Sequence, residues 1–282
     1  MLLELAIGDA YGAGFEYVDS NLIRQFNTLE RYVKHPRHSI VPGHYTDDTQ
    51  MSIAIAEAML SDELWTPRLL ADTFVRAFKR DPREGYAQGF YQFLKQIKDG
   101  EQFLAQIRPD SDKSGAAMRA APIGFFPTIE AVIEHATMQA KLTHDTPKGI
   151  GAAVAAALMS HYFLYQLGPK KDLGVFLARY VDEDWSDPWR GKVKSKGWMS
   201  VRAAATALMA HDQMSTLLQA CINFSGDVDT VTAIALAAGS CSREIAQDLP
   251  EHLIFGLEAG PYGREYLIEL DRKLLARYRP EH

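Results

Sequence analysis

The sequence has only two cysteines, no surplus of basic residues and no apolar run long enough to span a membrane. Cys221 and Cys241 lie on either side of one apolar segment without C-x-x-C spacing. This pattern argues against a disulfide framework or a thiolate metal site and favours a reducing, cytoplasmic location. A net charge of −6 lacks the broad positive field that nucleic acid attracts, so nucleic acid is not expected as a primary partner. The uninterrupted stretch of ~20 apolar residues that a membrane span needs is also missing.

Strand-like alternation is scarce, whereas apolar residues recur at spacings of three and four in nearly every segment. This periodicity predicts an all-α protein, a compact multi-helix bundle. With 282 residues, 47% of them hydrophobic, and no flexible linker, we expect one domain over residues 1–282. The expected helices are Thr49–Leu60, Pro67–Lys79, Gly85–Lys98, Ile129–Leu142, Lys148–Gln166, Leu173–Val181, Val201–His211, Met214–Asn223, Thr230–Ser240 and Gly263–Tyr278.

Some of these segments are rich in alanine and apolar on all faces. Examples are GIGAAVAAALM from Gly149 and TAIALAAGS from Thr232. A helix that is apolar all round is enclosed by other helices, and small side chains permit close backbone approach. We therefore expect these helices in the centre of the bundle.

Two acidic clusters stand at the starts of such apolar helices, about 180 residues apart. Thr46, Asp47 and Asp48 precede the first, where Asp48 or Thr49 is an ordinary candidate for the helix cap. The second cluster, in the stretch SGDVDT from Ser225, makes capping an insufficient explanation. Neither stretch contains a lysine or arginine, and each buried, uncompensated carboxylate costs several kcal/mol.

A positive charge must therefore come from elsewhere, and aspartate with threonine oxygens suits hard cations such as Mg²⁺ or Mn²⁺. Four carboxylates balance two divalent ions, so the clusters are interpreted as halves of one binuclear metal site. Zinc is less favoured because neither acidic run offers histidine or cysteine. In the D-x-D of the second cluster, both carboxylates converge if the backbone is still extended before the helix begins.

Six sequence motifs follow one another over roughly residues 5 to 240. They are IGDAYGAGFE from Ile7, GHYTDDTQM from Gly43, DPREGYAQG from Asp81, SGAAMRAAPIGFF from Ser114, LTHDTPKGIGAA from Leu142 and SGDVDTVTAIALAAG from Ser225. This ordered set resembles the ADP-ribosylglycohydrolase family, which includes dinitrogenase-reductase-activating glycohydrolases and ADP-ribosyl-acceptor hydrolases. The resemblance implies an all-α bundle with two Mg²⁺ or Mn²⁺ ions at the base of a cleft.

The resemblance also implies roles for individual residues near the ions. Asp229 is expected to bridge the ions, and Glu16 to lie near them and the scissile bond. Asp9, in the same GDAYG turn, is expected to be structural and to accept hydrogen bonds from loop amides. The implied metal ligands are Thr46, Asp47, Asp48, Asp227, Asp229 and Thr230.

The SGAAMR loop has small residues that let a ligand approach backbone N–H groups, which bind phosphate oxygens. Because the family uses this loop for the diphosphate and the distal ribose, Ser114, Gly115 and Met118 are binding candidates. Arg119 either reaches phosphate or forms an internal ion pair. His144, in the T-H-x-x-P motif, is expected to contact the ligand.

Two positions depart from the family pattern, and three aromatic residues have alternative roles. Ser225 stands where the family often has the first glycine of Gly-Gly-Asp, and Ser114 stands where asparagine is frequent. Tyr86, Phe125 and Phe126 either stack on adenine or pack in the core.

The resemblance implies hydrolysis at C1″ of an ADP-ribosyl group, which releases ADP-ribose from a modified protein side chain of arginine or serine type. The proton transfers fall to Glu16 or to a metal-bound carboxylate such as Asp47 or Asp229. Two alternatives remain open: hydrolysis of O-acetyl-ADP-ribose or another free ADP-ribose conjugate, and a non-catalytic ADP-ribose-binding or structural role.

Overall fold

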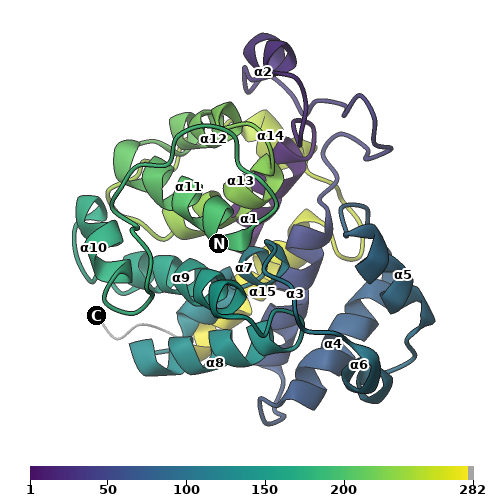
Figure 1. The fold of residues 1–282 in the computed structure, drawn as a ribbon. Coiled ribbons are helices and arrows are strands. Elements are labelled where there is room, and N and C mark those ends of the chain that lie inside the picture. The colour runs from purple at the N-terminus through teal and green to yellow at the C-terminus, as the bar shows by residue number, and fades with distance from the viewer. Residues whose placement is uncertain (279–282) are drawn as a thin grey trace.

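The computed structural model describes residues 1–278, and within that range the chain forms fifteen α-helices and two short 3₁₀ helices without a β-strand (Figure 1). The all-α prediction is therefore confirmed. The helices near the site are α1 (Leu2–Gly12), α3 (Asp47–Leu60), α5 (Gln88–Gln96), α7 (Gly115–Met118), α8 (Ile129–Lys141), α9 (Pro147–Leu164), α11 (Gly197–Ala210) and α13 (Val228–Gly239).

The remaining helices cover the bundle or extend one side of it (Figure 1). They are α2 (Ser20–Phe26), α4 (Pro67–Arg80), α6 (Gly100–Gln106), α10 (Leu173–Leu177), α12 (Met214–Asn223), α14 (Glu251–Gly256), α15 (Arg264–Arg277) and the 3₁₀ helices Ala121–Phe125 and Lys170–Asp172. None of the helices described is both long and apolar enough to cross a membrane. Both cysteines are free thiols.

The alanine-rich segments form the centre of the bundle. Every residue of α13 is buried, and so are twelve of the fourteen residues of α3. In α9, all residues from Ala152 to Phe163 are buried. The expectation that these helices are enclosed by other helices is confirmed.

The GDAYG stretch is not a turn, as the sequence analysis expected, but part of helix α1. Gly8 and Gly12 are four residues apart, so they lie on one face of the helix. A Cβ atom on Gly8 would lie 2.6 Å from the carbonyl oxygen of Thr232, and one on Gly12 would lie 2.5 Å from the Cα atom of Asp229. The glycines therefore serve close packing of α1 on α13, and not a change of chain direction.

Most expected helices exist, with shifted ends. The helix expected over Gly85–Lys98 begins at Gln88, because Gly85 has a φ of +101° that a helix does not allow. The helix expected over Leu173–Val181 ends at Leu177, and α11 begins at Gly197, four residues before the expected Val201. Helices α2, α6, α7 and α14, each of seven residues or fewer, were not predicted.

Candidate functional site: an acidic cavity between α3 and α13

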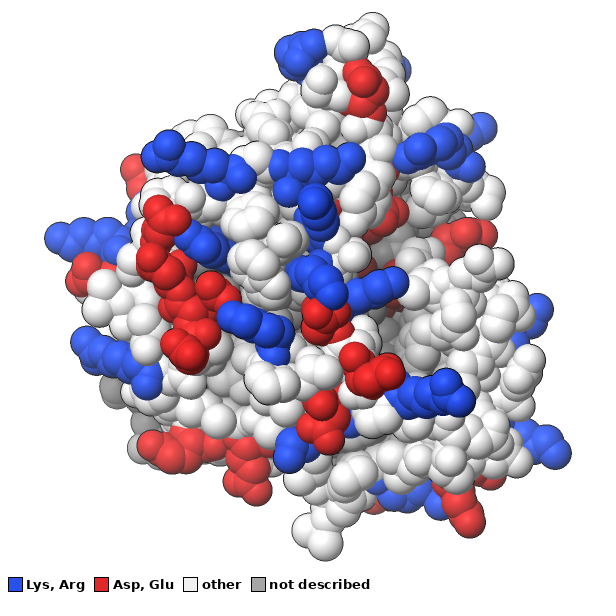
Figure 2. All heavy atoms as spheres, viewed as in Figure 1, with Lys and Arg blue, Asp and Glu red and all other residues white. Residues whose placement is uncertain are grey.

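The two acidic clusters meet at one end of a cavity of about 540 Å³. Asp47 and Asp48 form the first turn of α3, whereas Asp227 precedes α13 and Asp229 lies in its first turn. Glu16 joins them from the segment that follows α1. Figure 2 shows a recess on this face, with acidic side chains inside it and basic side chains on the surface around it. The expected meeting of the two clusters therefore occurs in the structure.

The carboxylates lie close together and are not paired with basic side chains. One carboxylate oxygen from each of Glu16, Asp227 and Asp229 lies within 4.8 Å of the others. The Oδ1 atom of Asp48 is buried and has no hydrogen-bond partner. Within residues 1–278, no lysine or arginine forms an ion pair with any of the cavity carboxylates.

Burial and mutual repulsion make these carboxylates hard to ionise. Burial, followed by the charge of Asp227, raises the pKa of Glu16 to about 7. Burial, with the charge of Asp9 as the next cause, raises the pKa of Asp47 and Asp48 well above the ordinary value, and burial with the charge of Glu16 does so for Asp229. Oxygen donors that crowd together without a counterion are the donor set that a hard divalent cation takes, so the residues present fit Mg²⁺ or Mn²⁺.

Helix α1 fixes the position of the start of α3 relative to the start of α13. The buried Asp9 carboxylate accepts four hydrogen bonds from the beginning of α3. These come from the amide and hydroxyl of Thr46, at 2.9 and 2.7 Å, and from the amide and hydroxyl of Thr49, at 3.0 and 2.6 Å. The expected structural role of Asp9 is confirmed. Because Gly8 and Gly12 place α13 against the same helix, α1 is the spacer that brings Asp48 and Asp229 together.

Both helix starts differ in detail from the sequence analysis. The cap of α3 is Thr46, whose hydroxyl accepts from the amide of Asp48 at 3.5 Å, and not Asp48 or Thr49. The Thr46 hydroxyl donates to Asp9, which leaves the second lone pair of its oxygen for a cation. The D-x-D of the second cluster is not extended, because Asp229 is already helical. The chain turns between α12 and α13 at Ser225 and Gly226, which have φ of +60° and +94°, and so before it reaches Asp227.

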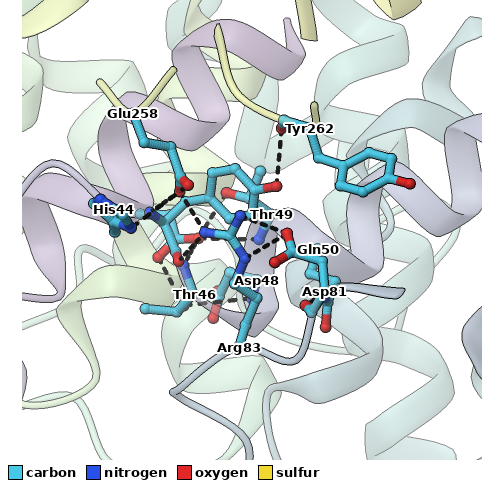
Figure 3. Close-up of polar contacts among 11 residues, drawn as sticks. His44, Thr46, Asp48, Thr49, Gln50, Asp81, Arg83, Glu258 and Tyr262 are labelled. Atoms are coloured by element: carbon cyan, nitrogen blue, oxygen red, sulfur yellow. Dashed lines mark hydrogen bonds and ion pairs between the residues drawn. The ribbon is translucent and has the colours of Figure 1, made fainter. Parts of the chain in front are cut away.

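Arg83, whose Nη1 atom lies 3.5 Å from the Tyr45 carbonyl oxygen, is engaged in structural ion pairs (Figure 3). Arg83 pairs with Asp81 at 2.6 Å and with Glu258, and its guanidinium lies 3.9 Å from the ring centre of Tyr45. Glu258 also accepts a hydrogen bond from the Tyr45 amide at 3.0 Å. This network fixes the segment before Thr46 and leaves Arg83 unavailable as a counterion for the cavity.

Glu16 is held by contacts that the sequence analysis missed. The ring Nε2 of the buried His35 lies 2.8 Å from the Glu16 carbonyl oxygen, while its Nδ1 accepts from the amides of Arg37 and His38. The next residue, Tyr17, has a φ of +48°, and its amide donates to the carbonyl of Gly226 at 2.8 Å. The Glu16 segment is thus tied to the turn that presents Asp227.

The five binding candidates all line the same cavity: Ser114, Gly115, Met118, Arg119 and His144. Arg119 is 1% exposed and donates to the side-chain oxygen of Gln139 at 2.7 Å and to the hydroxyl of Thr143 at 2.8 Å. In the described part of the chain no carboxylate pairs with Arg119. Its internal partners are therefore neutral oxygens, in place of the ion pair that the sequence analysis considered.

The cavity wall also has apolar residues, among them two phenylalanines that the sequence analysis missed. Phe90 and Phe93 of α5 line it together with Ile107. Their rings lie 6.0 Å apart and are nearly parallel, at 16°. The only signal in the sequence was their spacing of three residues, which places both side chains on one face of a helix. Tyr86 and Phe125 are instead buried in the core, and Phe126 stacks on His135, so the packing alternative holds for all three.

Comparison with known proteins identifies relatives over the whole chain. The profile of a family described as ADP-ribosylglycohydrolase matches residues 1–282. Human ADP-ribosylhydrolase ARH3 is 29% identical over 71% of this chain and 63% of its own length. The ADP-ribosyl-(dinitrogen reductase) glycohydrolase of Rhodospirillum rubrum is 23% identical over 83% of this chain and 81% of its own length.

The matched segment spans less than two thirds of the human relative. A solved chain described as an ADP-ribosylglycohydrolase-related protein complex superposes with a TM-score of 0.74, covering 99% of this chain and 95% of that chain at 21% identity. At that identity the likeness shows a shared fold.

Proposed function

This chain belongs to the ADP-ribosylglycohydrolase family, and from that premise we propose that it is a cation-dependent glycosidase. Its reaction is hydrolysis of the C1″ bond that links ADP-ribose to a protein side chain of arginine or serine type, with release of ADP-ribose. The observation that carries the proposal is the cluster of buried carboxylates without a basic partner, in the wall of a cavity that also has apolar lining residues.

The cations would be two Mg²⁺ or Mn²⁺ ions, and Asp229 would be among the residues that hold them. When bound, they supply positive charge that orients the vicinal ribose hydroxyls and acidifies a water molecule. The burial of Asp48 with one unpartnered oxygen supports this assignment, as does the orientation of the Thr46 hydroxyl toward Asp9. The residues that hold the ions are Thr46, Asp47, Asp48, Asp227, Asp229 and Thr230.

Glu16 moves the proton in this scheme, by accepting it from water or by donating it to the leaving atom. One oxygen of its carboxylate lies within 4.8 Å of oxygens of Asp227 and Asp229, and the scheme puts C1″ next to this group. The contacts of His35 with the Glu16 carbonyl fix the backbone from which this side chain extends. Asp9 keeps the start of α3 in place and takes no part in the chemistry.

The rest of the cavity is suited to the ADP moiety. The backbone N–H of Gly115 meets the diphosphate, and the charges of Lys113 and Arg108, which also line the cavity, attract it. The rings of Phe90 and Phe93 receive the adenine, because every base has a face that stacks on an aromatic ring.

Replacing Phe90 or Phe93 with alanine is expected to weaken ADP-ribose binding about 5- to 100-fold, since stacking of a base on an aromatic ring contributes ~1–3 kcal/mol. Binding of ribose 5-phosphate, which has no adenine, is expected to stay within about twofold. Isothermal titration of both ligands makes the comparison, with Phe255→Ala, at an exposed position of α14, as the matched control. An equal loss for both ligands would place the adenine elsewhere.

The function is tested by ADP-ribose release from arginine-linked, serine-linked and O-acetyl-linked substrates, each with Mg²⁺, with Mn²⁺ and with EDTA. Cation-dependent release from a protein-linked substrate is the expected result. Release from O-acetyl-ADP-ribose alone would replace the protein substrate with a free conjugate. Binding of ADP-ribose without turnover of any substrate would make the chain a non-catalytic binding protein.

A further inference from the structure

A buried chain of hydrogen bonds leads from Arg119 to the cavity and has no role in the reaction described above. The Nη2 atom of Arg119 lies 2.8 Å from the hydroxyl oxygen of Thr143, and that oxygen lies 2.7 Å from Nδ1 of His144. Thr143 and His144 are buried, at 5% and 6% exposed. Arg119 itself is fixed by Gln139, whose side-chain nitrogen donates to the carbonyl of Ala116 at 2.9 Å.

The direction of each hydrogen bond follows from the donors available. A guanidinium carries only donors, so the Thr143 oxygen accepts from Arg119. The hydroxyl has one hydrogen, and within residues 1–278 its only other polar neighbour is Nδ1 of His144. A buried hydroxyl hydrogen without an acceptor would bear the full cost of losing its hydrogen bond to water. The hydrogen therefore points to Nδ1, which must be unprotonated.

A neutral imidazole with a bare Nδ1 carries its hydrogen on Nε2. Burial and the nearby charge of Arg119 lower the pKa of His144 to about 3, which keeps the ring neutral. The Nε2 edge faces the ligand loop, because a Cβ atom on Gly115 would lie 3.1 Å from Cε1 and 3.4 Å from Nε2. In the described residues Nε2 has no hydrogen-bond partner, and the ring lines the cavity.

We propose that Arg119 and Thr143 are positioning residues that hold His144 in the Nε2–H form, so that the ring presents a fixed neutral donor to an acceptor oxygen in the middle of the cavity. The identity of that oxygen, on the diphosphate or the distal ribose, rests on the proposed function. The tautomer itself is a property of the ligand-free protein. This role accounts for a buried arginine that has no carboxylate partner. Because the guanidinium of Arg119 can only donate, it directs the Thr143 hydroxyl hydrogen toward His144.

The tautomer is read from long-range ¹H–¹⁵N correlation spectra of the full chain, with the His144 signals assigned from the His144→Gln variant. The wild type is expected to show an unprotonated Nδ1 and a protonated Nε2. Thr143→Val removes the hydroxyl at nearly constant volume, so the His144 signals are expected to shift toward a tautomer mixture. Loss of one ligand hydrogen bond is expected to raise the ADP-ribose dissociation constant about tenfold.

Two further variants separate positioning from general damage. Thr143→Ser restores the hydroxyl and is expected to restore both the tautomer and the affinity. Thr216→Val makes the same change at a half-buried position of α12 outside the cavity, where the hydroxyl donates to the Gln213 carbonyl, and is expected to alter neither.

A protonated Nδ1 in the wild type would overturn the proposal, and so would a Thr143→Val protein with an unchanged tautomer and affinity. Failure of Thr143→Ser to recover either property would also count against it. Absence of ADP-ribose binding by the wild type would refute the proposed function, whereas the ligand-free spectra would still decide the tautomer.

Discussion

Replacing Asp229 with asparagine is expected to lower kcat by about 10³-fold or more. The substitution removes the charge that we place between two divalent ions, and several kcal/mol of charge stabilisation in the transition state goes with it. Turnover of the best substrate from the panel, at saturating Mg²⁺ and Mn²⁺, measures this effect.

The same substitution is expected to leave the metal-free fold intact or more stable. Asp229 is buried among other carboxylates, and burial raises its pKa well above the ordinary value, so its removal relieves a desolvated acidic group. Asp62→Asn, at a fully exposed position, is the matched control and should retain activity. Full activity in the Asp229→Asn protein would refute the bridging assignment, and a collapsed far-UV spectrum would show that the residue is needed for folding.

The metal-free protein is expected to lose stability as the pH rises from about 4.5 to 7. Burial raises the pKa of Glu16 from 4.5 to about 7, and it also raises the pKa of Asp47 and Asp48 well above the ordinary value. In this window the native state keeps protons that the unfolded chain has released, so the free energy of unfolding falls with pH. The Glu16 shift alone corresponds to about 3 kcal/mol.

Bound cations are expected to remove this loss, because they favour the ionised carboxylates. At 100 times its dissociation constant, a cation adds ~2.7 kcal/mol to the free energy of unfolding. The measurement is urea unfolding at a series of pH values, with EDTA or with saturating Mg²⁺. The free energy of unfolding is expected to be higher with Mg²⁺, and the difference is expected to widen toward neutral pH. Asp229→Asn should flatten the slope in EDTA, whereas Asp62→Asn should not. A metal-free protein whose stability is constant or rises from pH 4.5 to 7 would contradict the account.

Local patterns in the sequence were sufficient for most of the longer helices and for the acidic residues. Periodicity predicts the enclosed helices α9 and α13, and the lack of lysine or arginine beside Asp47 and Asp227 predicts that a cation is needed. Features that depend on contacts between distant segments were missed. The GDAYG glycines look like a turn, because their purpose is visible only when α13 lies against them.

The same limit applies to the ligand end of the cavity. Phe90 and Phe93 have the spacing of core residues, and only the position of α5 at the cavity shows that they line it. His35 and Thr143 act on Glu16 and His144 through single hydrogen bonds, which no sequence spacing encodes. The alternatives for Arg119 were phosphate and carboxylate, and its observed internal partners are the neutral oxygens of Gln139 and Thr143.

Anomalous diffraction from crystals grown with Mn²⁺ tests the central claim most directly, that the acidic starts of α3 and α13 jointly hold divalent cations. The account predicts two manganese peaks within the cavity, with Asp229 in contact with both and Asp47, Asp48 and Asp227 around them. A map without manganese density between these helix starts, at a Mn²⁺ concentration that supports turnover, would contradict it.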